Sequence, residues 1–548
     1  MDDMNDGLAF LPLGGTGEIG MNLNLYRCGG KWLAIDCGIG FGGSDNPEVE
    51  IMMPDPAFIA ERRKDLLGLV ITHAHEDHIG AVAHLWRQLR VPVYATPFAI
   101  AVLKRKLGEA GLLSEVKLHV IQPGGRFTLG VFDLQFIPVA HSVPESQALA
   151  IRTPFGTVLH TGDWKLDPAP VVGPPTDQDA FARLGEEGVL AMVCDSTNAM
   201  VDGSSGSEAE VAESLDTLIK GLHGRIAVTC FASNVARVHS ISMAARRAGR
   251  QVALVGRSLR NLEAAARECG YLKGVPDFVA EDNAGSIPDD NLLLLITGSQ
   301  GEPRSALSRI SADTHPNIAL GEGDTVIYSS RMIPGNERAI MAVQDALVRR
   351  GVRVITDDDH MTHVSGHPAR SELRTLYSLV KPRISVPVHG EWRHMSAHAE
   401  LARQCGATPI LIEDGDILRL SGNGPEIVDS APVGRLALDG NRLVPLNGGV
   451  LSARRRMLFN GVVLGSAAMD KSGRLVGRPK VTAPGLFEDD DPERERVVTA
   501  FAEGLASLPA GLRDDEAALA DAARSALRRA LGRRLQKKPM VDVHLLRV

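Results

Sequence analysis

The chain has 548 residues, enough for about three to four domains with substantial cores. Its hydrophobic share of 44% and charged share of 23% are typical of a soluble globular protein. The formal net charge of −8 argues against a protein that coats nucleic acid, but it allows an enzyme that holds a polyanion in one cleft.

Cysteine spacing and the first residues indicate the compartment. The six cysteines lie far apart, which favours reduced thiols of a cytosolic protein over a disulfide framework. The start Met1-Asp2-Asp3 is acidic where a signal peptide would be basic, and no apolar run is long enough to cross a bilayer. We therefore expect a cytoplasmic protein that does not enter a membrane.

Residues 15–20 match the pattern G-x-G-x-x-G of dinucleotide-binding folds. That fingerprint requires the last glycine to open a helix, which receives the pyrophosphate. Here residues 21–26 alternate as a strand does, and the turn Gly29-Gly30 leads into the apolar run 32–35. The sequence therefore predicts a β-hairpin and disfavours nicotinamide or flavin binding.

The run His73-Ala-His75-Glu-Asp77-His78 follows an apolar stretch and is the most informative motif of the chain. Neutral imidazoles and a carboxylate are ligands that divalent zinc prefers, and four of them this close can serve two ions. A chance match at this spacing, with 17 histidines in 548 residues, is about one in a thousand. The motif favours a metal site over a solvated polar turn.

Six predicted strands each end at a titratable residue. They are 32–35 before Asp36, 66–71 before the histidine run, 132–139 before His141, 157–159 before His160 and Asp163, 189–193 before Asp195, and 384–388 before His389. Open α/β sheets collect their sites at the carboxyl ends of strands, so we expect these residues to converge. Each alone is equally explained as a capping aspartate or a packed histidine.

This set of residues resembles the metallo-β-lactamase superfamily. In that superfamily the last ligand histidine usually follows the bridging aspartate closely, whereas here His389 stands more than two hundred positions after Asp163. The gap contains helix-rich stretches such as 207–222 and 237–248, and it is similar to the β-CASP insertion of nucleases in the superfamily. Three residues match motifs of that insertion, namely Asp195, His367 and His389.

Further strings narrow the resemblance to the bacterial ribonuclease J family. Among them are Phe231-Ala-Ser-Asn234, Thr297–Pro303, His363–His367 and Pro387–Glu391. The resemblance implies an α/β protein, a metallo-β-lactamase αββα sandwich with an inserted β-CASP α/β domain and a small C-terminal α/β domain. The boundaries expected from it are 1–205 and 356–450 for the two parts of the sandwich, 206–355 for the insertion, and 451–548 for the linker and C-terminal domain.

The resemblance also implies two zinc ions per subunit, with Mn²⁺ or Mg²⁺ as alternatives. One ion is expected on His73, His75 and His141, and the other on Asp77, His78 and His389, with Asp163 bridging them. Asp36 would orient a ligand histidine from behind. A structural Ca²⁺ near the domain junction is a further expectation, with Asp439 and Glu50 as candidate ligands.

The activity implied is hydrolysis of RNA in maturation and decay, as a 5′-to-3′ exoribonuclease preferring 5′-monophosphate ends, with endoribonuclease action. Asp77, as a metal ligand, Asp195 and His367 are the expected catalytic residues. His367 is our candidate general acid for the departing 3′ oxygen, held by Asp195, although a substrate-binding or packed histidine is the alternative.

The segment 363–367 has small residues that let backbone amides approach an anion, and the family uses it to hold the 5′ phosphate. The candidate substrate-binding residues are Ser233, Asn234, Arg331, His363, Val364, Ser365, Gly366 and His367. Arg331 is equally explained as a salt-bridging surface residue. By the same resemblance we expect single-stranded RNA as partner and a homodimer or homotetramer.

Three alternatives stay open at this point. One is a small-molecule hydrolase of lactonase or thioesterase type on the same dizinc scaffold, which the long insertion argues against. Another is an endonuclease of the RNA 3′-processing kind, which usually lacks the strings quoted above. The third is a metal-free RNA-binding or scaffold protein, which the loss of a ligand would support; none is lost.

Overall fold

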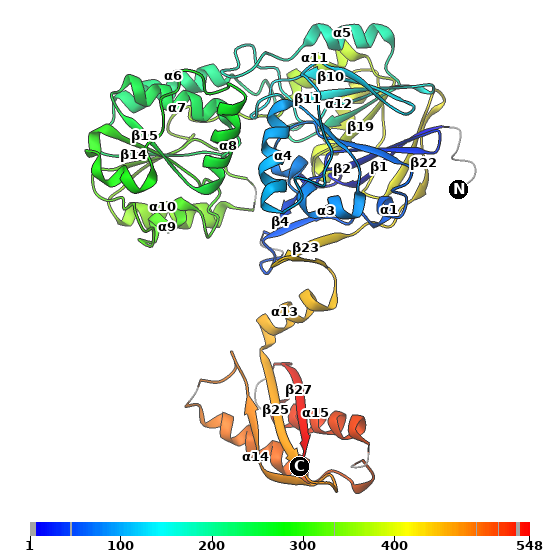
Figure 1. The fold of residues 1–548 in the computed structure, drawn as a ribbon, viewed down its shortest axis with the longest axis vertical. Coiled ribbons are helices and arrows are strands. Elements are labelled where there is room, and N and C mark those ends of the chain that lie inside the picture. The colour runs from blue at the N-terminus through cyan, green and yellow to red at the C-terminus, as the bar shows by residue number, and fades with distance from the viewer. Residues whose placement is uncertain (1–6, 44–45, 334, 489, 513–514, 533–536) are drawn as a thin grey trace. The chain divides into compact units, whose positions relative to one another are not determined.

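The computed structural model describes residues 7–43, 46–333, 335–488, 490–512, 515–532 and 537–548 (Figure 1). The chain forms two compact units. The first comprises Met1–Asp45 with Val49–Leu436, and the second comprises Asn46–Glu48 with Ala437–Val548. Among the described residues, no helix has the length and apolar character that a bilayer crossing requires.

Two sheets pack face to face in the first unit. The eight-stranded sheet has the order β22-β21-β1-β2-β3-β6-β7-β8, and the seven-stranded sheet has the order β20-β19-β13-β12-β11-β10-β9. The first contains β1 (Leu8–Gly14), β2 (Leu23–Cys28), β3 (Lys31–Ile35), β6 (Leu66–Val70), β7 (Val93–Ala95), β8 (Leu118–Val120), β21 (Asp416–Ser421) and β22 (Gly424–Ser430). The second contains β9 (Arg126–Leu129), β10 (Phe132–Pro138), β11 (Gln147–Thr153), β12 (Gly156–His160), β13 (Ala191–Asp195), β19 (Ile384–Val388) and β20 (Thr408–Pro409).

One apolar core joins the facing surfaces of these sheets, with Phe10 and Ile35 from the first packed in the same cluster as Phe136 and Val386 from the second. On the outside of the second sheet lie α5 (Gln178–Glu187), α11 (Arg370–Val380) and α12 (Trp392–Gln404), which share a second cluster with it. Helices α1 (Ala57–Ala60), α3 (Val82–Leu89) and α4 (Pro97–Glu109) lie beside the first (Figure 1). The predicted αββα sandwich is confirmed.

The expected hairpin near the N-terminus is also confirmed. Strands β2 and β3 pair antiparallel, with Asn24 opposite Ile35. Gly29 and Gly30 make the turn with φ of 56° and 74°, a region that glycine enters without strain. The element that follows Gly20 is therefore β2 and not a helix, so the glycine pattern has no helix N-terminus to offer a dinucleotide.

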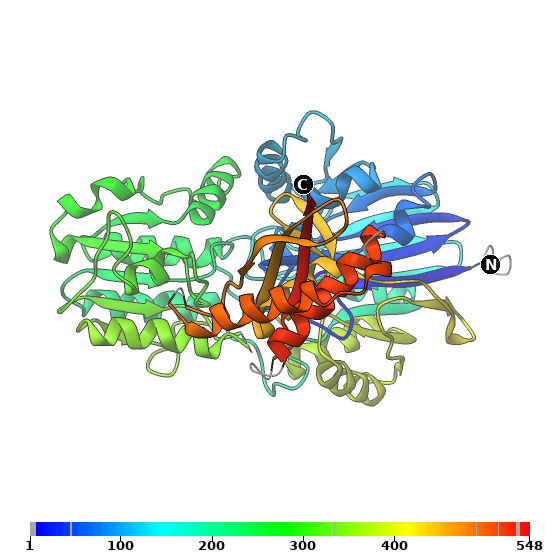
Figure 2. The same ribbon diagram turned by 90° about the horizontal axis from the view of Figure 1, so that it is seen from below.

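Between β13 and α11 the chain leaves the sandwich and builds an inserted lobe around a parallel sheet of order β15-β16-β14-β17-β18. Its strands are β14 (Ile226–Thr229), β15 (Gln251–Val255), β16 (Leu292–Ile296), β17 (Thr325–Tyr328) and β18 (Arg353–Ile355). Helices α6 (Glu208–Lys220), α7 (Val235–Arg247), α8 (Arg257–Glu268), α9 (Ala306–Ser311) and α10 (Glu337–Arg349) cover it (Figures 1 and 2). Because both faces are covered, a central strand such as β16 is apolar at every position. The helices predicted within 207–222 and 237–248 correspond to α6 and α7.

The second unit carries a three-stranded sheet of order β26-β25-β27, in which β25 runs antiparallel to β26 and parallel to β27. Its elements are α13 (Gly449–Asn460), β25 (Val462–Met469), β26 (Leu475–Thr482), α14 (Pro492–Ala506), α15 (Glu516–Gly532) and β27 (Met540–Arg547). Phe501 of α14 and Leu527 of α15 are fully buried in its core. This unit confirms the expected small C-terminal α/β domain. The remaining short elements of the described residues are α2 (Glu76–Ile79), β4 (Gly40–Phe41), β5 (Ile51–Pro54), β23 (Arg435–Asp439), β24 (Arg442–Pro445) and the 3₁₀ helices Glu281–Ser286, Asp289–Asn291 and Ala510–Leu512.

Candidate metal centre and the residues around it

The strand ends of both sheets converge as expected. Seven side chains form two groups of four in which the ligand atoms all lie within 4.8 Å of one another, and Asp163 also belongs to a third group with Asp195 and His367. One group contains His73, His75, His141 and Asp163, and the other contains Asp77, His78, Asp163 and His389. The first sheet delivers the 73–78 run after β6, and the second delivers the other three residues after β10, β12 and β19.

In the first group three imidazole nitrogens face a common centre. His75 Nδ1 lies 3.2 Å from His73 Nε2 and 3.0 Å from His141 Nε2. Asp163 Oδ2 lies 3.7 Å from both of those Nε2 atoms. Tetrahedral zinc with bonds of about 2.0–2.1 Å holds its ligand atoms about 3.3 Å apart, so these spacings suit one cation.

The ligand atoms of the second group are spaced similarly to those of the first. His78 Nε2 lies 3.5 Å from Asp77 Oδ2 and 3.3 Å from Asp163 Oδ2. His389 Nε2 lies 3.6 Å from Asp77 Oδ2 and 3.5 Å from Asp163 Oδ2. Because the same oxygen of Asp163 belongs to both groups, this carboxylate is placed to bridge two cations.

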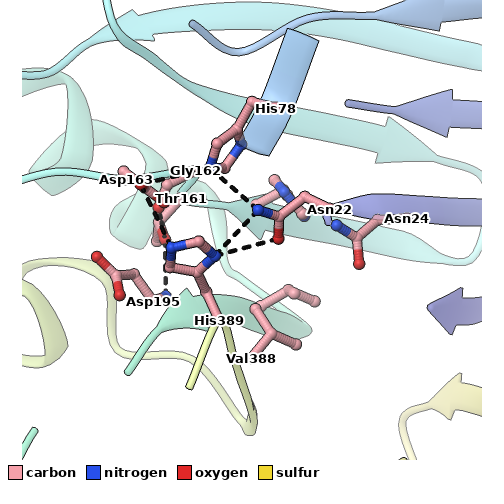
Figure 3. Close-up of a pocket in the computed structure, with 11 residues that line it drawn as sticks. Asn22, Asn24, His78, Thr161, Gly162, Asp163, Asp195, Val388 and His389 are labelled. Carbon is pink, nitrogen blue, oxygen red and sulfur yellow. Dashed lines mark hydrogen bonds and ion pairs between the residues drawn. The ribbon is translucent and has the colours of Figure 1, made fainter. Parts of the chain in front are cut away.

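The outward-facing nitrogen of each histidine has a polar neighbour, which orients the inward nitrogen toward its group. The inward Nε2 of His78 also lies 3.1 Å from Asn22 Nδ2. His78 Nδ1 donates to Asp36 Oδ2 at 2.7 Å, and His141 Nδ1 donates to the carbonyl of Gly366 at 2.6 Å. The remaining pairs are His73 Nδ1 with Thr72 Oγ1 at 3.0 Å, His75 Nε2 with Ser142 Oγ at 3.3 Å, and His389 Nδ1 with Asn22 Oδ1 at 3.2 Å. Figure 3 shows Asn22 between the rings of His78 and His389.

Two atoms of the candidate ligands, Asp163 Oδ1 and His389 Nε2, are buried without a hydrogen-bond partner among the described residues. An unsatisfied buried polar atom costs about 1–3 kcal/mol, so a pocket built this way is completed by a cation. The donor set of imidazoles and carboxylates is the one that zinc and similar divalent metals take. The side chains therefore fit a divalent metal centre.

The electrostatics of the first group agree with this interpretation, whereas burial at His78 is outweighed by Asp163, Asp77 and Asp36, which raise its pKa well above the usual value. Burial holds the pKa of His73 and His141 well below the usual range and lowers that of His75 to about 4, so all three are neutral ligands at pH 7. Burial opposes ionisation of Asp163, but His389 and His78 outweigh it and hold the pKa of this carboxyl well below its usual value. The bridging residue is thus a carboxylate.

Glycines at 15–20 have a structural role in this pocket. Gly15 has φ of 95°, and a Cβ there would lie 2.3 Å from Asn22 Oδ1. The carbonyl of Gly15 accepts a hydrogen bond of 2.7 Å from the backbone N–H of His389, which itself has φ of 50°. The segment that resembles a dinucleotide fingerprint therefore holds Asn22 and His389 in place.

His367 and Asp195 form a pair at the edge of the metal centre. His367 Nδ1 donates to Asp195 Oδ2 at 2.8 Å, and it lies 3.8 Å from Asp163 Oδ2. The carboxylate is buried and also accepts hydrogen bonds from Thr197. Burial lowers the pKa of His367, but Asp195 and Asp163 outweigh it and raise this pKa to about 9. The imidazole can therefore carry a proton at neutral pH.

The segment 363–367 lies against the first metal group through the carbonyl of Gly366. Ser365 Oγ accepts hydrogen bonds from Asn198 Nδ2 at 2.7 Å and from the backbone N–H of His367 at 3.1 Å. Val364 is buried, and His363 Nδ1 is buried without a partner among the described residues. The loop is therefore held rigidly beside the ligands.

The other candidate substrate residues lie in the inserted lobe. Asn234 is buried, and its Oδ1 caps α7 by accepting from the N–H of Arg237 at 2.8 Å. Ser233 is half-buried beside it, and Arg331 is exposed. The carbonyl of Arg331 accepts from Gln300 Nε2 at 2.9 Å. Substrate contact by these three residues stays a prediction.

Several residues of the site were not singled out from the sequence. Asn22 sits in an alternating stretch with no distinguishing signal, and Thr72 stands directly before His73. Thr72 Oγ1 donates to Asp36, which places both behind the ligands. His160, which was predicted from the sequence to stand at a strand end, is not in the metal groups found among the described residues; its Nδ1 lies 3.1 Å from Tyr26 Oη. Position next to a motif was the only available signal for Thr72.

The carboxylates suggested for Ca²⁺ are engaged with arginines. Asp439 accepts two hydrogen bonds of 2.8 Å from Arg454, and Glu50 forms an ion pair of 3.4 Å with Arg304. Neither belongs to the metal-ligand groups found in the part of the chain that the structure describes. A calcium site stays a prediction.

Four family models match this chain. They are the ribonuclease J β-CASP domain over residues 223–347, the metallo-β-lactamase superfamily over 22–220, the Zn-dependent metallo-hydrolase RNA specificity domain over 337–412, and the ribonuclease J C-terminal domain over 449–548. A solved structure of a protein of unknown function from Enterococcus faecalis V583 is similar in fold, with a TM-score of 0.53 and 16% identity. It covers 76% of this chain and 100% of its own.

Full-length relatives agree with the family models. A ribonuclease J of Sinorhizobium meliloti is 45% identical, covering 99% of this chain and 97% of the relative. One of Mycolicibacterium smegmatis is 40% identical, covering 98% and 96%. One of Synechocystis is 37% identical, covering 97% and 86%. With this similarity over its whole length, the chain belongs to the ribonuclease J family of the metallo-β-lactamase superfamily.

Proposed function

We propose that this chain hydrolyses RNA phosphodiester bonds at two zinc ions, removing nucleotides from a 5′-monophosphate end in the 5′-to-3′ direction and also cutting internally. Membership of the ribonuclease J family makes it a metal-dependent ribonuclease with RNA as substrate. The observation that carries the finer proposal is the shared Oδ2 of Asp163 between two groups of ligand atoms, with the His367–Asp195 pair beside them.

When bound, two divalent cations acidify water and stabilise negative charge on the phosphoryl oxygens. The protein's own part is to hold the ligands in one protonation state and one orientation. Asp36 and Asn22 fix the rings of His78 and His389. Mn²⁺ or Mg²⁺ in place of zinc belongs to the same proposal.

Hydrolysis forms a bond between water oxygen and phosphorus and breaks the bond between phosphorus and the 3′ oxygen. The products are a 3′ hydroxyl and a new 5′ phosphate. We assign to His367 the proton that the departing 3′ oxygen needs. Its Nδ1 is occupied by Asp195, so Nε2 is the atom that donates.

A 5′ phosphate is expected at the segment 363–367. This segment has small residues and lies beside the metal groups through Gly366. Burial first, and then the nearby Arg237, Arg331 and Lys165, lower the pKa of His363 to about 3, so this imidazole is neutral at pH 7. Arg237 and Lys165 are paired with Glu208 and Asp167, so we expect the backbone amides of the segment to favour a doubly charged phosphate over a hydroxyl.

We propose that the chain associates into a dimer or tetramer through its second unit. Sedimentation of the full chain measures this oligomeric state. The boundaries near residues 205, 355 and 450 belong to the proposal too. A small-molecule hydrolase is not favoured, because the matches to β-CASP and RNA specificity domains cover the inserted lobe and the return to the sandwich.

The test uses the full chain loaded with zinc and RNA labelled at its 3′ end or internally. We expect mononucleotides from 5′-monophosphate RNA, slower digestion of 5′-hydroxyl RNA, and some internal fragments. Equal rates on both ends would contradict the 5′-phosphate preference. Release of mononucleotides from the 3′ end would contradict the direction.

A further inference from the structure

Four charged side chains with no part in the proposed chemistry lie buried in a row beside the metal centre. They are Lys165, Asp167, Glu208 and Arg237, which are 1%, 2%, 3% and 0% exposed. Lys165 Nζ pairs with Asp167 Oδ2 at 3.0 Å. The same carboxylate accepts from the backbone N–H of Glu208 at 2.9 Å and from Ser207 Oγ at 2.7 Å. The row thus passes from the sandwich into the N-terminus of α6.

Arg237 ends the row in the inserted lobe and uses its whole guanidinium group. Its Nε and Nη2 donate to the carboxylate of Glu208 at 3.0–3.2 Å. Its Nη1 donates to the carbonyl of Thr362 at 2.7 Å and to the carbonyl and hydroxyl of Ser329 at 3.0 and 2.7 Å. One planar group therefore fixes a carboxylate and two backbone segments at once.

The two ends of the row touch the segments that matter for the site. Lys165 is two residues after Asp163, and its N–H donates to the carbonyl of Ala140, the residue before His141, at 2.8 Å. At the other end, Thr362 directly precedes the segment 363–367. A continuous series of hydrogen bonds thus joins metal-ligand segments to the loop that we expect to hold the 5′ phosphate.

Stability alone does not explain such a row. Removing charges from water costs several kcal/mol per ion, and a buried pair that is fully satisfied often contributes little net stability compared with apolar residues of similar volume. What the row supplies is orientation, because a guanidinium with all its donors used permits one arrangement of its partners.

We propose that Arg237, held by Glu208, is a positioning residue that fixes the segment 363–367 beside the metal centre and so sets the preference for a 5′-monophosphate end. The inference rests on the proposed function for the identity of the bound group. The claim that Arg237 fixes the segment 363–367 depends only on the contacts of Arg237, and it is measured separately from the end preference.

The test compares Arg237→Lys with a matched control, Arg250→Lys. Lysine keeps the charge but its single ammonium cannot hold a carboxylate and two backbone segments together. Arg250 is also buried, at 7% exposure, and donates to the carbonyls of Leu222 at 2.6 Å and Gly224 at 2.7 Å. These partners lie before β14, at the amino-terminal edge of the same parallel sheet, away from Thr362.

Two readouts are taken on the zinc-loaded full chain. The first is the ratio of kcat/KM for 5′-monophosphate and 5′-hydroxyl RNA. We expect Arg237→Lys to lower this ratio about tenfold or more, mainly through KM for the monophosphate, equivalent to about 1.4 kcal/mol. The second is amide hydrogen exchange of residues 363–367, which we expect to speed up. Arg250→Lys should leave both within twofold of the original protein.

The inference is overturned if exchange at 363–367 is unchanged in Arg237→Lys, or if both variants lose the preference equally. If the original protein shows no end preference, the proposed function fails, and the exchange measurement still decides whether Arg237 fixes the loop. Should Arg237→Lys not fold, the pair Glu208→Met with Arg237→Met removes both charges and leaves neither unpaired. The same loss of preference and faster exchange are expected for it.

Discussion

Replacement of His367 by alanine tests the assignment of the general acid. The imidazole is joined to Asp195 through Nδ1 and belongs only to the three-residue group with Asp163 and Asp195, outside the two groups of four, so we expect His367→Ala to retain two bound cations. A positioned general acid contributes about 10²–10⁴-fold in rate, which is about 3–5 kcal/mol of transition-state stabilisation. Cleavage of ordinary RNA should fall by that factor with zinc content unchanged.

A second substrate makes this test specific for proton donation. In RNA whose scissile 3′ oxygen is replaced by sulfur, the leaving group is a thiolate with an ordinary pKa near 8.5, which departs without a proton. We expect His367→Ala to cleave this substrate within about tenfold of the original protein. Single-turnover rates measured with equal metal loading give the comparison. An equal defect on oxygen and sulfur substrates would refute the assignment and indicate a binding role for His367.

Three further predictions concern the support of the site and stability. Asp36 has a left-handed backbone with φ of 62°, which asparagine also adopts, so Asp36→Asn removes only the charge that faces His78 Nδ1 at 2.7 Å. Chelator competition should show about 10–100-fold weaker metal binding. Unchanged affinity would contradict the role of Asp36 in orienting His78. Gly38→Ala would place a Cβ 1.6 Å from the carbonyl oxygen of Asp77, so thermal unfolding should show that the free energy of unfolding falls by about 3 kcal/mol. The control Gly7→Ala, whose Cβ would have nothing within 4 Å, should leave stability unchanged. Equal effects of the two substitutions would contradict the predicted clash at Gly38. Burial and Glu18 raise the pKa of Asp414 to about 8, so the folded protein keeps a proton that the unfolded chain releases near pH 4. The free energy of unfolding should therefore decline as pH rises from 4 to 8. Asp414→Asn should flatten the corresponding decline in Tm, and an identical slope in the variant would disprove the linkage.

The convergence of the candidate metal ligands could be predicted from the sequence because their signal is local. The run from His73 to His78 is a compact motif, and the later ligands each follow an apolar strand, so strand-end position located them. The structure adds that these strands belong to two facing sheets, with β3 and β6 in one and β10, β12, β13 and β19 in the other. A pattern read along the chain identifies strand ends but does not assign strands to sheets.

Apart from Asp36, which stands at a strand end and contacts His78 as expected, the supporting residues could not be predicted, because their roles depend on partners far away in the chain. Asn22 acts on His389, which is 367 positions later, and Arg237 acts on Thr362, which is 125 positions later. The glycines at 15–20 matched the dinucleotide-binding motif because a glycine indicates an unusual backbone conformation or a close contact, but not which group makes that contact. At Gly15 the neighbouring groups are the side chain of Asn22 and the backbone N–H of His389.

The proposed activity depends on two cations held by seven side chains from both sheets. The most direct measurement is an anomalous difference map at the zinc edge from crystals of the active, zinc-loaded protein. We predict two peaks about 4 Å apart or less, one among His73, His75, His141 and Asp163 and one among Asp77, His78, Asp163 and His389. No peak in active protein, or a second peak away from His389, would contradict the account.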